Sequence, residues 1–74
     1  MKVKSIGSNQ IEVTKKNGTF LISYETPLAA LISGIGWIRT EKFWSVTTSK
    51  HINGWVEGAA KKVPQEELDG HFGV

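Results

Sequence analysis

The stretch QIEVTKKNGTFLISY (residues 10–24) decides the fold of this chain. Asn17 and Gly18 favour a type I′ turn, because both central residues of that turn need a positive φ. A two-residue loop at this point pairs Lys16 with Thr19 and predicts a β-hairpin whose side chains alternate between two faces. Leu21 is the only apolar residue on the otherwise polar face. The apolar face holds Ile11, Val13, Phe20, Ile22 and Tyr24.

Short apolar runs on both sides of the hairpin predict further strands. Lys2 to Ile6 precedes it as a short strand. After it, Pro27 biases Thr26 towards an extended conformation. The glycine-containing turn at 33–36 then separates two more apolar segments. These segments are Leu28 to Ile32 and Trp37 to Thr40, and Phe43 to Val46 extends or follows the second one.

One amphipathic helix is expected after these strands, over residues about 48–60. Thr47 or Thr48 is a suitable N-cap, because a hydroxyl accepts a bond from an otherwise unpaired backbone N–H. An apolar stripe follows at helical spacing, which predicts a buried face. Its members are Ile52, Trp55, Val56 and Ala59. The sequence therefore predicts an α+β fold, a small antiparallel β-meander of four to five strands with this helix packed on the sheet.

The chain has 74 residues, which predicts a single β-rich domain over residues 1–62 followed by an acidic tail over 63–74. Residues 1–62 hold nine basic and four acidic residues, a net charge of +5. Residues 63–74 hold three acids and no Lys or Arg, a net charge of −3. Pro64 suits the first position of a helix, so a short helix in this tail is compatible with the sequence.

Several classes of function are disfavoured by composition. The chain has no cysteine, so disulfides, thiolate catalysis and cysteine metal sites are excluded. His51 and His71 have no spacing typical of a metal site, and no acid–base pair can be assigned, so neither an enzyme nor a cofactor is expected. The N-terminus has no secretory signal, and no apolar run is long enough to span a membrane. A cytoplasmic location is therefore expected.

Two segments resemble a known family. They are Ser23-Tyr24-Glu25-Thr26-Pro27-Leu28-Ala29 and Trp44-Ser45-Val46-Thr47-Thr48-Ser49-Lys50-His51-Ile52-Asn53. This pattern resembles a family of small uncharacterised proteins encoded by bacteriophages, plasmids and bacteria, in which valine usually stands at the position of Leu28. The resemblance covers a little under half of the chain. It implies a phage or mobile-element origin, with the host cytoplasm as location, and no specific activity.

The segment at the expected helix start is a candidate anion site. Thr47, Thr48, Ser49, Lys50 and His51 place three hydroxyls, a cation and an imidazole where free N–H groups attract phosphate. The alternative interpretation is simpler and is favoured over an anion site. A threonine at this point is an ordinary N-cap, and the histidine packs beside the sheet.

Basic and aromatic residues also alternate just before the helix. Arg39, Lys42 and Lys50 flank Trp37 and Trp44, a pattern typical of surfaces that contact a nucleic-acid backbone and stack bases. The competing interpretation buries the tryptophans, because a small domain has few other large apolar side chains.

Two functions remain open from the sequence. The first is an accessory protein that binds nucleic acid through this basic and aromatic surface. The second is an interaction module that binds and inhibits or redirects a host protein through a sheet edge or the acidic tail. A homo-oligomer is compatible with either function.

Overall fold

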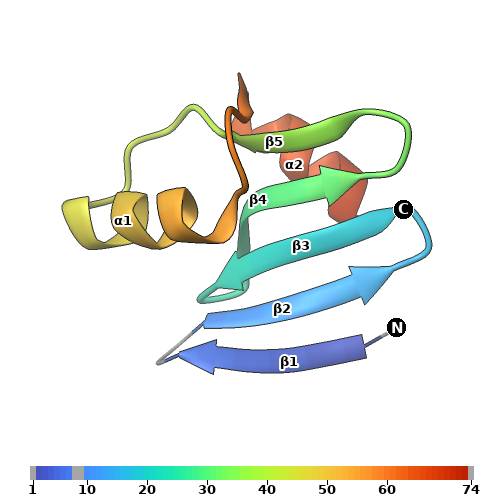
Figure 1. Ribbon diagram of the computed structural model, residues 1–74, viewed down its shortest axis with the longest axis horizontal. Helices are drawn as coiled ribbons and strands as arrows, with labels where there is room; N and C mark the ends of the chain where they lie inside the picture. The colour runs from blue at the N-terminus through green and yellow to red at the C-terminus, as the bar shows by residue number, and fades with distance from the viewer. Residues whose placement is uncertain (1, 8–9, 74) are drawn as a thin grey trace.

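The computed structural model of the protein describes residues 2–7 and 10–73, and over these ranges it shows one six-stranded sheet and two helices. The strands lie in chain order across the sheet (Figure 1). The first five are antiparallel neighbours, namely β1 (Lys2–Gly7), β2 (Gln10–Lys15), β3 (Gly18–Ser23), β4 (Thr26–Ile32) and β5 (Gly36–Thr40). The α+β class predicted from the sequence is confirmed, with more elements than the four to five strands and one helix expected.

The sheet becomes mixed at its last strand. After β5 the chain forms helix α1 (Val46–Trp55) and then returns as β6 (Lys61–Val63), which pairs in parallel with β5. Helix α2 (Gln65–Gly73) follows directly. Figure 1 shows α2 behind the sheet and α1 at the left end of the molecule. No helix in the described part of the chain is long and apolar enough to cross a membrane.

The β2–β3 hairpin forms, but its register differs from the predicted one. Val13 pairs with Phe20, and the turn lies at Lys16–Asn17 rather than one residue later. The shift is even, so Val13, Phe20 and Ile22 still face the core, with Ile11 packed against it. The prediction was wrong for Tyr24, which lies in the β3–β4 turn and is exposed. Gly18 explains the shift, because it pairs with β4, and a Cβ on Gly18 would lie only 2.3 Å from the carbonyl oxygen of Leu31.

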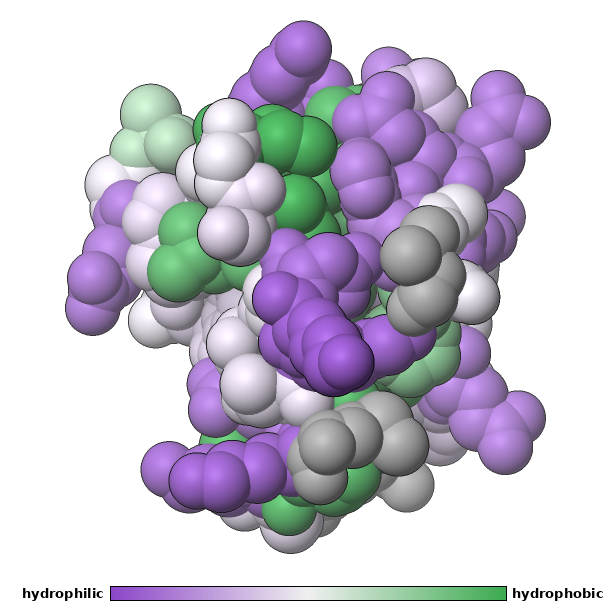
Figure 2. Space-filling model, turned by 90° about the vertical axis from the view of Figure 1, so that its right-hand side faces the viewer, coloured by the Kyte–Doolittle hydropathy of each residue, from purple (hydrophilic) through white to green (hydrophobic). Residues whose placement is uncertain are grey.

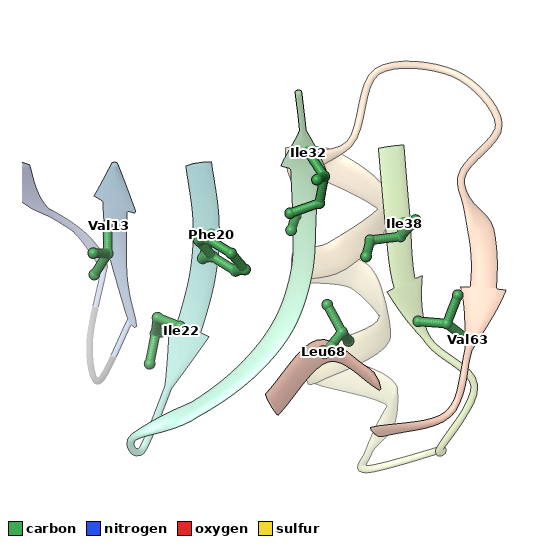
Figure 3. Close-up of a cluster of buried hydrophobic side chains, with 8 residues drawn as sticks. Val13, Phe20, Ile22, Ile32, Ile38, Val63 and Leu68 are labelled. Carbon is green, nitrogen blue, oxygen red and sulfur yellow. The ribbon is translucent and has the colours of Figure 1, made fainter. Parts of the chain in front are cut away.

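One face of the sheet packs against α2 and forms the larger core (Figure 3). Phe72 of α2 adds an edge-to-face ring contact with Phe20, at 5.2 Å between centroids. Residues 63–73 are therefore not a tail on a finished domain, since they supply a strand end, a helix and part of the core. The buried members of this cluster are Val13, Phe20, Ile22, Ala30, Ile32, Ile38, Val63 and Leu68.

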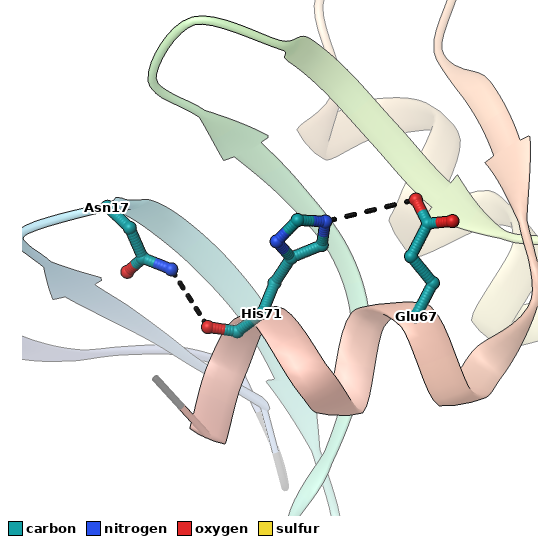
Figure 4. A network of polar contacts seen from close by, with 3 residues as sticks. All are labelled: Asn17, Glu67 and His71. Atoms are coloured by element: carbon teal, nitrogen blue, oxygen red, sulfur yellow. Dashed lines mark hydrogen bonds and ion pairs between the residues drawn. The ribbon is translucent and has the colours of Figure 1, made fainter.

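The β2–β3 turn holds the end of α2 in place. Asn17 donates from Nδ2 to the backbone oxygen of His71 at 2.8 Å, and Lys15 donates to the backbone oxygen of Phe72. Within α2, Nε2 of His71 lies 3.8 Å from Oε2 of Glu67 (Figure 4). Side chains of the turn thus satisfy carbonyls that a helix C-terminus leaves without intrahelical partners. His71, which belongs to the segment predicted to be an acidic tail, is half-buried.

The opposite face of the sheet packs against α1 and forms a second, smaller core. Leu21, the apparent exception in the hairpin pattern, is fully buried there against Ile52 and Val56 of the α1 segment. Both faces of the central strands are therefore covered. The complete set of buried members is Leu21, Leu28, Ala29, Ile52 and Val56.

Helix α1 starts earlier and ends earlier than the predicted span of about 48–60. Its N-cap is Ser45 rather than Thr47 or Thr48, and the Ser45 side chain accepts a bond from the backbone N–H of Thr48 at 3.0 Å. The helix ends at Trp55, because Val56 is extended and Gly58 has a φ of 82°. Ala59 of the predicted stripe therefore lies outside the helix and is exposed.

Candidate functional site

Two segments that are distant in sequence meet at one end of the molecule. The turn between β3 and β4 lies beside the chain that enters α1, at the left of Figure 1. Two adjoining hollows form there, of about 120 and 340 Å³, and they share Ser23, Tyr24 and Thr48. The smaller is also lined by Thr26, Leu28 and Trp44, and the larger by Gln10, Ser45, Thr47 and His51.

The β3–β4 turn has an unusual backbone. Its two central residues, Tyr24 and Glu25, have φ values of 49° and 66°. Turns of this shape are dominated by Asn, Asp and Gly, because a left-handed conformation costs about 1–2 kcal/mol for other residues. The tyrosine side chain is 75% exposed, so burial in the core does not explain its presence. Strain held at an exposed aromatic residue is typical of a functional position.

Three exposed aromatic side chains lie at this end of the molecule, and we call Tyr24, Phe43 and Trp44 the aromatic ledge. Trp44 is 42% exposed, and the ammonium of Lys42 lies 4.1 Å from the centroid of its ring. Val46, which follows in the chain, is also exposed. The opposite end, shown in Figure 2, has mostly hydrophilic residues with smaller apolar areas between them.

Polar groups of α1 line the floor beside the aromatic ledge. The Ser45 hydroxyl donates to the hydroxyl of Thr48 at 3.0 Å, so these two side chains satisfy one another and the helix start. Gln10, a buried residue of β2, donates its amide N–H to Nδ1 of His51. In the neutral ring this bond leaves the proton on Nε2, which makes Nε2 a donor. The floor therefore offers hydroxyl and imidazole groups held by defined bonds.

The eight residues singled out from the sequence fall into two groups. The structure brings Trp44, Thr47, Thr48 and His51 together around the hollows, with Lys42 stacked on the tryptophan. Arg39 instead donates to Oδ1 of Asn53 at 2.5 Å and ties β5 to α1. Ser49 and Lys50 line neither hollow.

The sequence pattern missed the contribution of the β3–β4 turn and of β2. Ser23, Tyr24, Thr26 and Leu28 belong to the first segment of the family resemblance, but nothing in their chemistry pointed to a site. Gln10 is separated from His51 by 41 positions. Only the pairing of the strands brings these residues beside the start of α1.

The arrangement suits the binding of a planar group rather than a metal. Within the described ranges, no group of three or more His, Cys, Asp or Glu side chains could hold a metal ion. Exposed rings offer flat surfaces for stacking, and the neighbouring hydroxyls and imidazole offer hydrogen bonds.

Comparison with known proteins identifies the family of the chain. No curated protein and no solved structure matches the chain. A family of unknown function, DUF8033, matches residues 1–70, which include all the residues of both hollows. The chain belongs to the DUF8033 family.

Proposed function

We propose that the protein binds single-stranded nucleic acid, with bases stacked on the aromatic ledge and the strand passing over the start of α1. The observation that carries this proposal is the exposure of Tyr24 and Trp44 around one hollow, on a turn that keeps a strained backbone. Stacking on an aromatic side chain contributes about 1–3 kcal/mol per base. Only an unpaired base presents a free face for it, which favours single strands over duplexes.

The basic residues near the start of α1 favour an anionic ligand at this end, whereas Glu25 in the β3–β4 turn opposes it. Lys42 lies over the ring of Trp44, and Lys50 is exposed on α1. The acids of α2 belong to the helix on the other face of the sheet. A backbone phosphate near the aromatic ledge would therefore meet cations and hydroxyls of α1, with the acidic helix separated from it by the sheet.

The origin implied by the sequence resemblance suggests where the bound strand would come from. In a phage or mobile-element protein, the strand would be phage or host DNA or RNA in the host cytoplasm. The ledge itself does not select between DNA and RNA, because every base has a face on which a ring can stack.

The test is fluorescence anisotropy with labelled single strands of about 12 nucleotides, a length within the range of known single-strand sites. Binding should saturate at about 50 mM salt and weaken steeply at about 200 mM. Trp44→Ala should weaken it about tenfold, the loss of one stacked base. Ile35→Ala removes another exposed apolar side chain, from the β4–β5 turn, and should change nothing.

The proposal is overturned if single strands show no saturable binding. It is also overturned if Trp44→Ala and Ile35→Ala bind equally well, because the ledge is then not the contact surface. Equal affinity for a duplex of the same sequence would also overturn it, because binding would then rest on contact with the nucleic-acid backbone and not on base stacking.

A further inference from the structure

A third hollow lies on the α1 side of the sheet and shares no residue with the two described above. It has a volume of about 380 Å³ and lies between the strands and the end of α1. Glu12, Leu31 and Trp37 line it from three different strands, and Trp55 and Glu57 line it from the end of α1 and the residues that follow.

The two tryptophans form perpendicular walls. The rings of Trp37 and Trp55 are 5.5 Å apart between centroids, with an angle of 85° between their planes. Trp55 donates from Nε1 to Oε1 of Glu12 at 2.8 Å, and this bond fixes the orientation of the ring. Both rings are half-buried, so each is held by packing while part of its surface stays accessible.

The hollow has an acidic lining. Glu12 and Glu57 both line it, and no Lys or Arg is among its lining residues in the described chain. Of the basic residues on the neighbouring strands, Lys4 of β1 is the cross-strand partner of Glu12, and Arg39 of β5 donates to Asn53, so Glu57 is the carboxylate of the lining that faces no such partner in these pairs. Electron-rich ring faces beside carboxylates attract an organic cation and repel phosphate.

We infer that this hollow binds the ammonium group of a lysine side chain presented by a partner protein. The ammonium would lie against the ring faces and Glu57, a combination of cation–π and charge attraction. Leu31 is 40% exposed at the same hollow and offers an apolar surface for the lysine stem. The inference does not rest on nucleic-acid binding, since the two sites share no residue.

The test is an NMR titration that follows the indole N–H signals of Trp37 and Trp55 as a short peptide with one lysine is added. Both signals should shift and saturate with the lysine peptide and with its trimethyl-lysine form. The acetyl-lysine and norleucine forms, which have no charge, should leave them unshifted. Glu57→Gln should weaken binding about threefold through the loss of one charge contact. Glu66→Gln, an equally exposed acid on α2, is the matched control and should change nothing.

A second variant separates loss of the site from loss of the fold. Gly54 lines the hollow, and a Cβ there would meet nothing within 4 Å. Gly54→Leu should therefore fold normally and abolish the lysine-dependent shifts by filling the space. The inference is overturned if the indole signals do not shift and saturate, if the uncharged peptides bind equally well, or if Gly54→Leu binds normally. None of these outcomes depends on whether Trp44→Ala affects oligonucleotide binding.

Discussion

Leu68→Ala tests whether residues 63–73 are part of the folded core. Leu68 of α2 is fully buried among the side chains of the larger core. Truncation of a buried leucine to alanine costs about 2–5 kcal/mol, which combines lost transfer free energy with the cavity that remains. A domain of this length has a total free energy of unfolding of only about 4–11 kcal/mol. One substitution in the segment predicted to be a tail should therefore remove a large share of the stability.

Urea denaturation followed by tryptophan fluorescence measures this effect. With a slope of about 1 kcal/mol per molar urea for a small domain, the midpoint should fall by at least about 2 M. Leu31→Ala is the matched control, because it makes the same chemical change at a leucine that is 40% exposed. It should lower the midpoint by less than half as much. Equal midpoints for Leu68→Ala and the unmodified protein would refute the reasoning, because α2 would then contribute nothing to the fold.

Three further predictions concern the backbone. Gly18→Ala should reduce the free energy of unfolding by about 2 kcal/mol and lower the melting temperature, because the new Cβ meets a carbonyl oxygen at 2.3 Å; Gly70→Ala, in open space on α2, should raise the melting temperature. Replacing Tyr24 by Asn together with Glu25 by Gly should stabilise the β3–β4 turn by about 1 kcal/mol and weaken oligonucleotide binding in the anisotropy assay. Ser45→Ala should cost about 1 kcal/mol in thermal unfolding through loss of the N-cap, whereas an unchanged melting temperature would remove that role.

The sequence predicts the hairpin faces well and the hairpin register poorly. Alternation along β2 and β3 depends only on which side chains are apolar, and it places Val13 and Phe20 correctly in the core. The register depends on contacts that no local pattern contains. Gly18 must allow the backbone of β4 to approach, and the side chain of Asn17 is bound to the end of α2.

The sequence predicts at most a short helix where the nine-residue α2 forms, and the reason is similar. Leu68 and Phe72 are the only large apolar residues along α2, and Gly70 lies between them. Such a weak pattern does not predict a nine-residue helix by itself, because helices this short owe their stability to tertiary packing. The apolar face of the sheet supplies that packing once the strands are assembled.

Only part of the candidate site can be predicted from the sequence. The cluster around Trp44 and His51 stands out through residue type, since an aromatic residue beside hydroxyls and a histidine is chemically distinctive, but the exposure of Trp44 is known only from the structure. Residue type does not single out Tyr24, because its positive φ is a property of the folded turn. Its closeness to Trp44 follows from the pairing of β3 with β4 and from the crossover that contains α1.

Helix α1 relates the two proposed sites to each other. Its first residues border the aromatic ledge, and its last residues, Gly54 and Trp55, border the acidic hollow. A helix of ten residues is about 15 Å long, so a base stacked at one end and a lysine ammonium held at the other would not overlap. The two ligands also have opposite charges, and each site has the complementary lining. The two sites share no lining residue and have linings suited to opposite charges, so the proposed nucleic-acid strand and basic partner would contact different surfaces at the two ends of one helix.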